Sequence, residues 1–211
     1  MKGLLIFISL AKKVFIPLFF LTLLSAQNNA LDFDGSNDYI QITDDASLTS
    51  TSAITITAWF KKVSGSGWMS LVGKGTTDAN EEYILMVKDN QVYFDVGQGS
   101  GPYLQQNATI SSNTWHHIAA VHSRSGSAST LKVYLNGQDI GGTTSGWWIT
   151  PNDNSHPVTI GSRFSTSNAL FQGQIDEVRI WSDVRTQAEI KASMHTELSG
   201  SESNLVAYYN F

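Results

Sequence analysis

Short apolar segments alternate along the chain with clusters of Gly, Ser, Asn and Asp. The segments are rich in Val, Ile, Thr, Phe, Tyr and Trp, which fit the pleated, half-buried surface of a β-strand. Between Ile54 and Lys61 every second residue is apolar, which predicts a strand with one buried face and one half-open face. The whole pattern predicts an all-β sandwich. The predicted strands cover residues 30–34, 39–42, 54–63, 68–74, 83–88, 92–96, 103–110, 115–123, 131–136, 158–163, 173–181 and 205–211.

One short helix is predicted near the end of the chain, at Thr186–His195. Thr186 is followed three residues later by Glu189, which is the spacing of a capping box. Ile190 and Met194 lie four residues apart and therefore share one helix face. We expect this helix to cover a sheet edge.

The first 26 residues have the order of a secretory signal peptide. Lysines precede the apolar run 14–24, and the small residues Ser25 and Ala26 follow it. The run of 11 residues is too short to cross a bilayer by itself. We therefore expect residues 1–26 to be removed, leaving a secreted or cell-envelope, extracellular protein without membrane insertion. Retention of the segment as a membrane anchor is the alternative.

The composition is that of a folded domain, with 41% hydrophobic and 15% charged residues. No internal repeat or long linker interrupts residues 27–211, which predicts one domain. Removal of residues 1–26 takes away three lysines and no acidic residue, so the formal net charge changes from -5 to -8. An acidic chain without a basic cluster argues against nucleic-acid binding. The chain has no cysteine, so core packing or a metal must stabilise a secreted form, as suits a bacterial protein.

Four sequence segments, taken in their order along the chain and with their spacing, resemble the motifs of a known family. They are Ala30–Gly35, Trp115–Val121, Val133–Gly137 and Gly173–Trp181. With them the chain resembles the laminin G-like domains of the concanavalin A-like lectin-glucanase superfamily over residues 30–211. The resemblance implies two curved antiparallel sheets in a jelly-roll sandwich. Many members of this superfamily also have a structural calcium ion and a ligand surface on the concave sheet or its rim loops, and the resemblance implies the same for this chain.

Asp176 is the main candidate metal ligand. Strand alternation places its carboxylate on the same face as Val178 and Ile180, where it needs a cation, a basic side chain or backbone donors as a partner. The resemblance implies that a structural calcium joins Asp176 to oxygens of Asp34 and Gly35. The alternative is that Asp176 pairs with Arg179 or caps a turn.

Catalytic groups are not evident in the sequence. A glycoside hydrolase needs two carboxylates across the scissile bond, and the Glu-x-Asp-x-Glu pattern of catalytic relatives does not occur. Glu81 and Glu82 are adjacent and therefore point to opposite sides of a strand, as do His116 and His117. We therefore predict that the chain is not an enzyme.

Aromatic residues in polar loops are the candidate sugar-binding residues, because sugars stack their C–H faces on aromatic rings. Trp59, Trp115 and Trp181 fall in predicted strands, where packing against a sheet is the expected role. The candidate ligand-binding residues are Trp147, Trp148, Trp68 and Tyr103, with Asn152 and Asp153 as polar contacts.

These observations favour a secreted, non-catalytic carbohydrate-binding module whose partner is a glycan or a glycan-bearing surface. The alternative is a structural or adhesion module that makes protein contacts within a larger extracellular or envelope protein. The fold class accommodates both.

Overall fold

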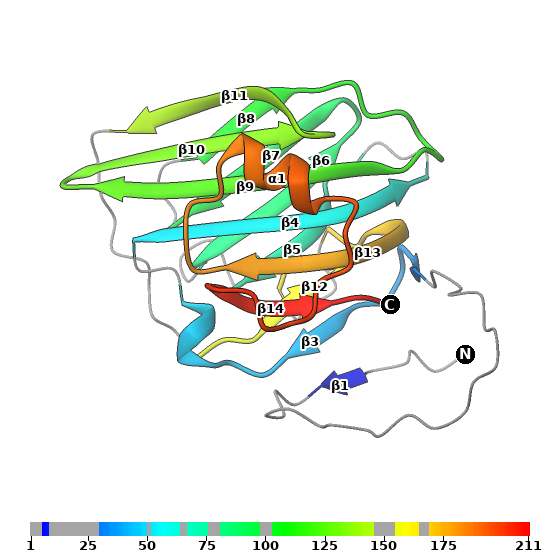
Figure 1. Cartoon of the computed structure of the whole chain (residues 1–211). Coiled ribbons are helices and arrows are strands. Elements are labelled where there is room, and N and C mark those ends of the chain that lie inside the picture. Colours follow the sequence, from blue (N-terminus) through cyan, green and yellow to red (C-terminus); the bar gives the residue numbers. More distant parts are fainter. Residues whose placement is uncertain are drawn as a thin grey trace.

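The structure is a computed structural model that describes residues 6–8, 30–49, 52–63, 67–75, 81–97, 103–145, 155–164 and 169–211. The described strands form two sheets stacked face to face, which confirms the predicted all-β, two-sheet jelly-roll sandwich (Figure 1). No helix in this part of the chain is long and apolar enough to cross a membrane.

The first sheet has seven strands in the order β1-β3-β12-β5-β6-β7-β8 among the described residues. Their bounds are β1 Ile6–Ile8, β3 Ile40–Ile42, β12 Val158–Ile160, β5 Met69–Lys74, β6 Tyr83–Lys88, β7 Gln91–Val96 and β8 Tyr103–Asn107. All neighbours pair antiparallel except β1 and β3, which pair parallel. The strand β1 lies inside the predicted signal peptide.

The second sheet follows the order β11-β10-β9-β4-β13-β14, with β2 also paired to β13. Their bounds are β11 Gln138–Ser145, β10 Ala128–Leu135, β9 His116–Ser125, β4 Ala53–Lys62, β13 Gln172–Trp181, β14 Leu205–Tyr209 and β2 Leu31–Asp34. Strand β11 is missing from the sequence prediction. Its residues are mostly polar or Gly, and pairing with β10 through the turn at Asn136 and Gly137, both at positive φ, extends the sheet.

The core lies between the two sheets. Ile56 and Phe60 of β4 face Leu85 and Phe94 of the first sheet's central strands within one buried apolar cluster. The prediction for β4 is only half right, because Thr55 on its other face is also buried. The hydroxyl of Thr55 donates to the carbonyl of Asp183 (2.7 Å), so the segment before the helix covers this end of β4.

The helix α1 (Gln187–Ser193) begins at the predicted capping box, since Thr186 and Glu189 bond each other's backbone N–H. It does not cover a sheet edge as predicted. It lies on the outer face of the second sheet, in front of β9 and β10 (Figure 1). Ile190 packs there against Ala119, Val121 and Tyr134. This apolar strip on an outward face needs a cover, which explains the position of the helix.

Candidate functional site

A β-bulge at Glu177 determines where the predicted metal ligand points. Glu177 has a φ of 54°, and the pairing of β13 with β4 shifts between Asp176 and Arg179. Val178 therefore faces the core, whereas Asp176 stands opposite Trp59. The prediction that Asp176 shares a face with Val178 is wrong, because the extra residue of the bulge breaks the alternation.

The partners of Asp176 are backbone donors. Asp176 is buried, with 4% of the residue exposed, and its Oδ1 accepts hydrogen bonds from the N–H of Glu177 (2.7 Å) and of Phe211 (3.0 Å). Burial raises the pKa of Asp176, and these two N–H groups oppose the shift. Arg179 makes its ion pair with Glu177 instead.

The structure does not bring the three predicted calcium ligands together. Asp34 pairs with Gln172 on β13, four residues from Asp176, which corresponds to about 13 Å along the strand. The Oδ1 atom of Asp34 accepts from the N–H of Ser36 (2.7 Å), and Gly35 follows at the turn. Among the residues that the structure describes, no three His, Cys, Asp or Glu side chains are grouped to hold a metal. Calcium thus stays a prediction, and one ion cannot use both Asp34 and Asp176 in this arrangement.

One pocket, here called the Tyr93 pocket, lies on the outer face of the first sheet and has a volume of about 320 Å³. Strand alternation builds it: Val92 and Phe94 of β7 enter the core, so Tyr93 and Asp95 point outward. Neighbouring strands add Met86 and Gln105, each paired with Tyr93. Its lining residues are Trp68, Glu81, Met86, Tyr93, Asp95, Gln105 and Arg163.

Three aromatic rings contact one another in a cluster at the Tyr93 pocket. The ring of Tyr93 meets Trp68 edge to face at 5.7 Å and stacks on Tyr103 at 5.7 Å between centroids. Tyr103 is 59% exposed, the highest value among the large hydrophobic side chains described. Two of the predicted ligand-binding residues, Trp68 and Tyr103, are therefore brought together by a third residue that the sequence analysis missed.

Charged groups line the other side of the Tyr93 pocket. Glu81, only 2% exposed, accepts a hydrogen bond from Nη2 of Arg163 at 3.0 Å. Asp95, 8% exposed, accepts from the Tyr93 hydroxyl at 2.9 Å. Burial, followed by the nearby Asp95 carboxylate, raises the pKa of Tyr93, so this hydroxyl stays protonated and keeps donating.

Sequence reasoning missed Tyr93, Asp95, Gln105 and Arg163 because they lie in or beside predicted strands rather than in loops. The alternation of polar and apolar residues along Gln91–Val96 was the available signal, since it places Tyr93 and Asp95 on one face. The other predicted ligand residues, Trp147, Trp148, Asn152 and Asp153, lie outside the described residues.

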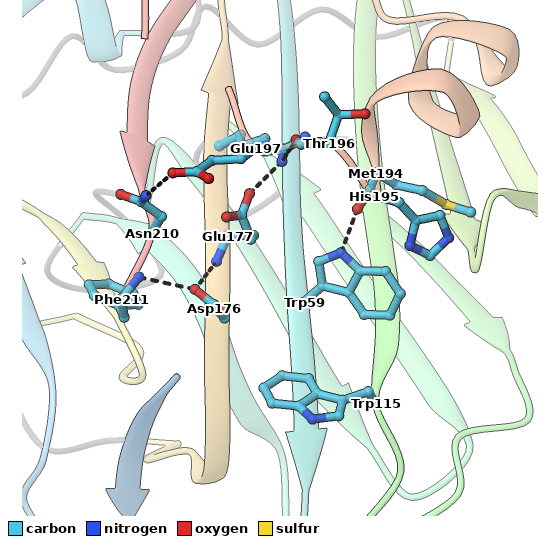
Figure 2. Close-up of a pocket in the computed structure, with 11 residues that line it drawn as sticks. Trp59, Trp115, Asp176, Glu177, Met194, His195, Thr196, Glu197, Asn210 and Phe211 are labelled. Atoms are coloured by element: carbon cyan, nitrogen blue, oxygen red, sulfur yellow. Dashed lines mark hydrogen bonds and ion pairs between the residues drawn. The ribbon is translucent and has the colours of Figure 1, made fainter. Parts of the chain in front are cut away.

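A second pocket, here called the Trp59 pocket, lies on the outer face of the second sheet beside α1 and has a volume of about 530 Å³ (Figure 2). Its lining residues are Trp59, Trp115, Asp176, Glu177, Arg179, Met194, His195, Thr196, Glu197, Asn210 and Phe211. The indole N–H of Trp59 donates to the carbonyl of Met194 (2.7 Å), and Lys61 lies 5.5 Å from the ring of Trp115. Trp115 is 36% exposed, so its indole is only partly packed against the sheet, whereas Trp181 is buried as predicted.

The charged groups of the Trp59 pocket are engaged with one another. Glu177 pairs with Arg179 and accepts from the hydroxyl of Tyr208 (2.8 Å). Arg179 also donates to the carbonyls of Ser193 (2.8 Å) and Thr196 (2.7 Å). These bonds fasten the segment after α1 to β13 and β14. The charges of this pocket therefore have an evident role in holding the fold.

Three of the five histidines, His116, His117 and His122, are buried in β9. His117 is buried next to Trp59, with ring centroids 5.4 Å apart. Burial, followed by the nearby Arg179 and His195, lowers the pKa of His117 to about 3. An imidazole of this kind is neutral at physiological pH, as expected of a packing residue.

Residues 34–191 match the family model of the concanavalin A-like lectin/glucanases superfamily. The chain belongs to this superfamily. No curated protein matches the chain.

Several solved structures have a similar fold. A proposed carbohydrate-binding protein from Bacteroides ovatus matches with a TM-score of 0.67 and 24% identity over 86% of this chain. The CBM40 module of the Ruminococcus gnavus IT-sialidase, solved with α2,3-sialyllactose, matches with a TM-score of 0.65 and 17% identity, covering 77% of this chain and 94% of the module. A pentraxin from Limulus polyphemus matches with a TM-score of 0.59 and 15% identity, covering 85% of this chain and 91% of that one. The chain spans 50% of the Bacteroides ovatus protein.

Proposed function

We propose that this superfamily member is a non-catalytic carbohydrate-binding module and that its sugar site is the Tyr93 pocket. The observation that carries the proposal is the cluster of the aromatic rings of Trp68, Tyr93 and Tyr103 beside the polar groups that line the pocket. An apolar surface next to convergent hydrogen-bonding groups is the arrangement that a sugar ring requires.

The chemistry of the pocket matches the two kinds of surface on a sugar. The exposed ring of Tyr103 offers a flat apolar surface for the C–H groups of a pyranose. The carboxylates of Glu81 and Asp95 accept hydrogen bonds from sugar hydroxyls, and the amide of Gln105 both donates and accepts. Each of these groups comes from a strand or a strand end, so the site is held by the sheet.

The comparisons support this proposal at the level of the fold. Two structural neighbours are a proposed carbohydrate-binding protein and a sialidase module solved with a sialylated sugar. Tyr103 at the Tyr93 pocket is 59% exposed, against 36% for Trp115 at the Trp59 pocket, which supports the Tyr93 pocket as the sugar site.

The absence of catalysis is part of the proposal, although the pocket holds two carboxylates. Glu81 is paired with Arg163, and Asp95 accepts from Tyr93. A general acid must be able to give a proton to the glycosidic oxygen, whereas Glu81 is held in an ion pair by Nη2 of Arg163 at 3.0 Å. We therefore expect no release of reducing sugar from any glycan that the protein binds.

Secretion and calcium binding belong to the same proposal. The order of charged, apolar and small residues in the first 26 residues supports export, and the oxygen-rich turn at Asp34 supports a calcium ion. Detection of the protein in the medium or at the cell surface, with an N-terminus near residue 27, would test export.

A glycan array followed by calorimetry tests the sugar site. Tyr103→Ala and Trp115→Ala form a matched pair, because each removes an exposed aromatic ring from one of the two opposite outer faces. We expect Tyr103→Ala to weaken binding of the strongest array ligand by about tenfold and Trp115→Ala to leave it unchanged. Loss of binding only in Trp115→Ala would move the site to the Trp59 pocket. Binding to proteins but to no glycan would favour an adhesion module.

A further inference from the structure

We propose that the Trp59 pocket binds an alkylammonium group, such as the end of a lysine side chain. The inference goes beyond the proposed function, because the Trp59 pocket lies on the outer face of the second sheet and the Tyr93 pocket on that of the first. It follows from a buried carboxylate that lines the pocket, from two indoles on the other side of it and from the charge of the lining.

Three neighbouring strands place a carboxylate and two aromatic rings around the pocket. Asp176 on β13 is paired with Trp59 on β4, and side chains paired in this way have Cβ atoms about 4.5–5.5 Å apart. Trp115 directly precedes β9, the strand on the other side of β4. Figure 2 shows the acidic side chains on one side of the pocket and the two indoles on the other. A ligand between them therefore contacts a carboxylate and an aromatic ring at the same time.

The carboxylate of Asp176 has one oxygen available to a ligand. Its Oδ1 accepts from the N–H groups of Glu177 and Phe211, whereas Oδ2 has no hydrogen-bond partner among the residues that the structure describes. Asp176 is 4% exposed and lines the pocket. A charged oxygen held away from bulk water without a donor is costly, and a donor that enters the pocket removes this cost. Arg179 does not supply the donor, because its guanidinium bonds Glu177 and two backbone carbonyls.

The charge of the lining favours a cation. Among the described residues of the lining, the carboxylates of Asp176, Glu177 and Glu197 and the one guanidinium of Arg179 give a formal charge of -2. Glu197 is exposed, and its carboxylate accepts from the amide of Asn210 at 3.4 Å. A ligand anion would be repelled by these carboxylates, whereas an ammonium donates to them in charge-assisted hydrogen bonds. The ligand is therefore a cation rather than a carboxylate or a phosphate.

The ring of Trp115 already holds a cation of the chain itself. The ammonium of Lys61 lies 5.5 Å from the centroid of this indole, within the range of a cation–π contact. Trp115 is 36% exposed, so a ligand can reach the ring. The indoles of Trp59 and Trp115 also offer apolar surface to a methylene stem, as lysine side chains use when they lie along a protein surface. This combination favours an ammonium on an apolar stem, and it makes Lys61 a competitor of the ligand.

The test compares two probes that differ in one charge. Nα-acetyl-lysine methylamide carries the ammonium, and its Nε-acetylated form keeps the stem without the charge. The full chain is titrated with each probe in the presence of a chelator, and NMR follows the indole N–H of Trp115 and the backbone N–H of Phe211, which bonds Asp176. We expect the charged probe to bind at least about tenfold more tightly than the acetylated one.

Glucosamine is the third probe, because its ammonium has no apolar stem. It should bind more weakly than the charged lysine probe. Equal binding of the two lysine probes, tighter binding of glucosamine or the absence of binding by all three would overturn the inference. None of these results bears on the Tyr93 pocket, so the proposed function is tested separately.

Asp176→Asn is the main variant, because an amide oxygen can still accept from the two backbone N–H groups while the charge is lost. It should weaken binding of the charged probe by about tenfold and leave the acetylated probe unchanged. Asp139→Asn is the matched control, since it removes the same charge from an outlying hairpin, and it should change neither.

Lys61→Gln tests the inference in the opposite direction. It removes the ammonium that competes for the ring of Trp115, so the charged probe should bind about threefold more tightly. This variant also keeps the test open if Asp176→Asn does not fold, because it alters a partly exposed side chain. Unchanged affinity for the charged probe in the folded variants would contradict the proposed site.

Discussion

The carboxylate of Asp176 accepts a hydrogen bond from the N–H of Phe211 at 3.0 Å, which ties β13 to the segment after β14. The same oxygen accepts from the N–H of Glu177 in the bulge. A single buried side chain therefore satisfies two backbone donors that β pairing leaves free. This relationship gives Asp176 a structural role that needs no metal.

Asp176→Ala should destabilise the fold. Removal of the carboxylate leaves the N–H groups of Glu177 and Phe211 without this acceptor, at a cost of about 1–3 kcal/mol for each group that stays dry. Urea unfolding of the wild type and the variant, in the presence of a chelator, measures the difference. Asp139→Ala is a suitable control, because its half-exposed carboxylate lies in an outlying hairpin. Equal stability of Asp176→Ala and the wild type would refute the structural role.

Calcium binding can be separated from this role. If the oxygen-rich turn at Asp34 binds calcium, an ion at a hundredfold its Kd should stabilise the fold by about 2.7 kcal/mol. We expect any such gain to vanish in Asp34→Asn and to persist in Asp176→Asn, because the two residues lie far apart on β2 and β13. Thermal melts with calcium and with chelator give the answer. Loss of the calcium response in Asp176→Asn would restore the shared site that the family resemblance implies.

The alternation of apolar residues predicted the fold because each strand buries one face in a shared core, and Ile56 and Phe60 lie where this pattern places them. The capping box at Thr186 also needed only local information. The orientation of Asp176 could not be predicted, since it depends on one extra residue at Glu177 that is visible only in the pairing with β4. The Tyr93 pocket was found in part. Trp68 was recognisable in its loop, whereas Arg163 joins the pocket only through the pairing of distant strands.

Stability should fall as the pH decreases from 6.5 to 5. Burial lowers the pKa of His117 to about 3 and that of His122 to about 4, with nearby arginines adding to both shifts. The unfolded chain takes up these protons below pH 6.5 and the folded chain does not, so the stability present above pH 6.5 is lost as the pH falls toward the folded pKa values. The loss at pH 5 is roughly 2 kcal/mol for each histidine. Urea titrations at pH 7, 6 and 5 measure it. His117→Asn should make the free energy of unfolding depend less on pH, even if it lowers stability at every pH. An unchanged pH dependence would show that His117 is protonated in the folded chain.

The position of α1 on the outer face of the second sheet predicts that stability and sugar binding can be changed independently. Ile190→Ala removes a buried side chain that packs against Ala119, Val121 and Tyr134, which should cost about 2–5 kcal/mol. The Tyr93 pocket lies on the other sheet, with the whole core in between. Below its lowered melting temperature, the variant should therefore bind the array ligand as tightly as the wild type. Calorimetry at 10 °C measures sugar affinity, and a melting curve of each protein measures stability. Val184→Ala is the control, because it shortens an exposed side chain. A drop in affinity in folded Ile190→Ala would mean that the sugar site depends on the helix side of the sandwich, contrary to the site proposed here.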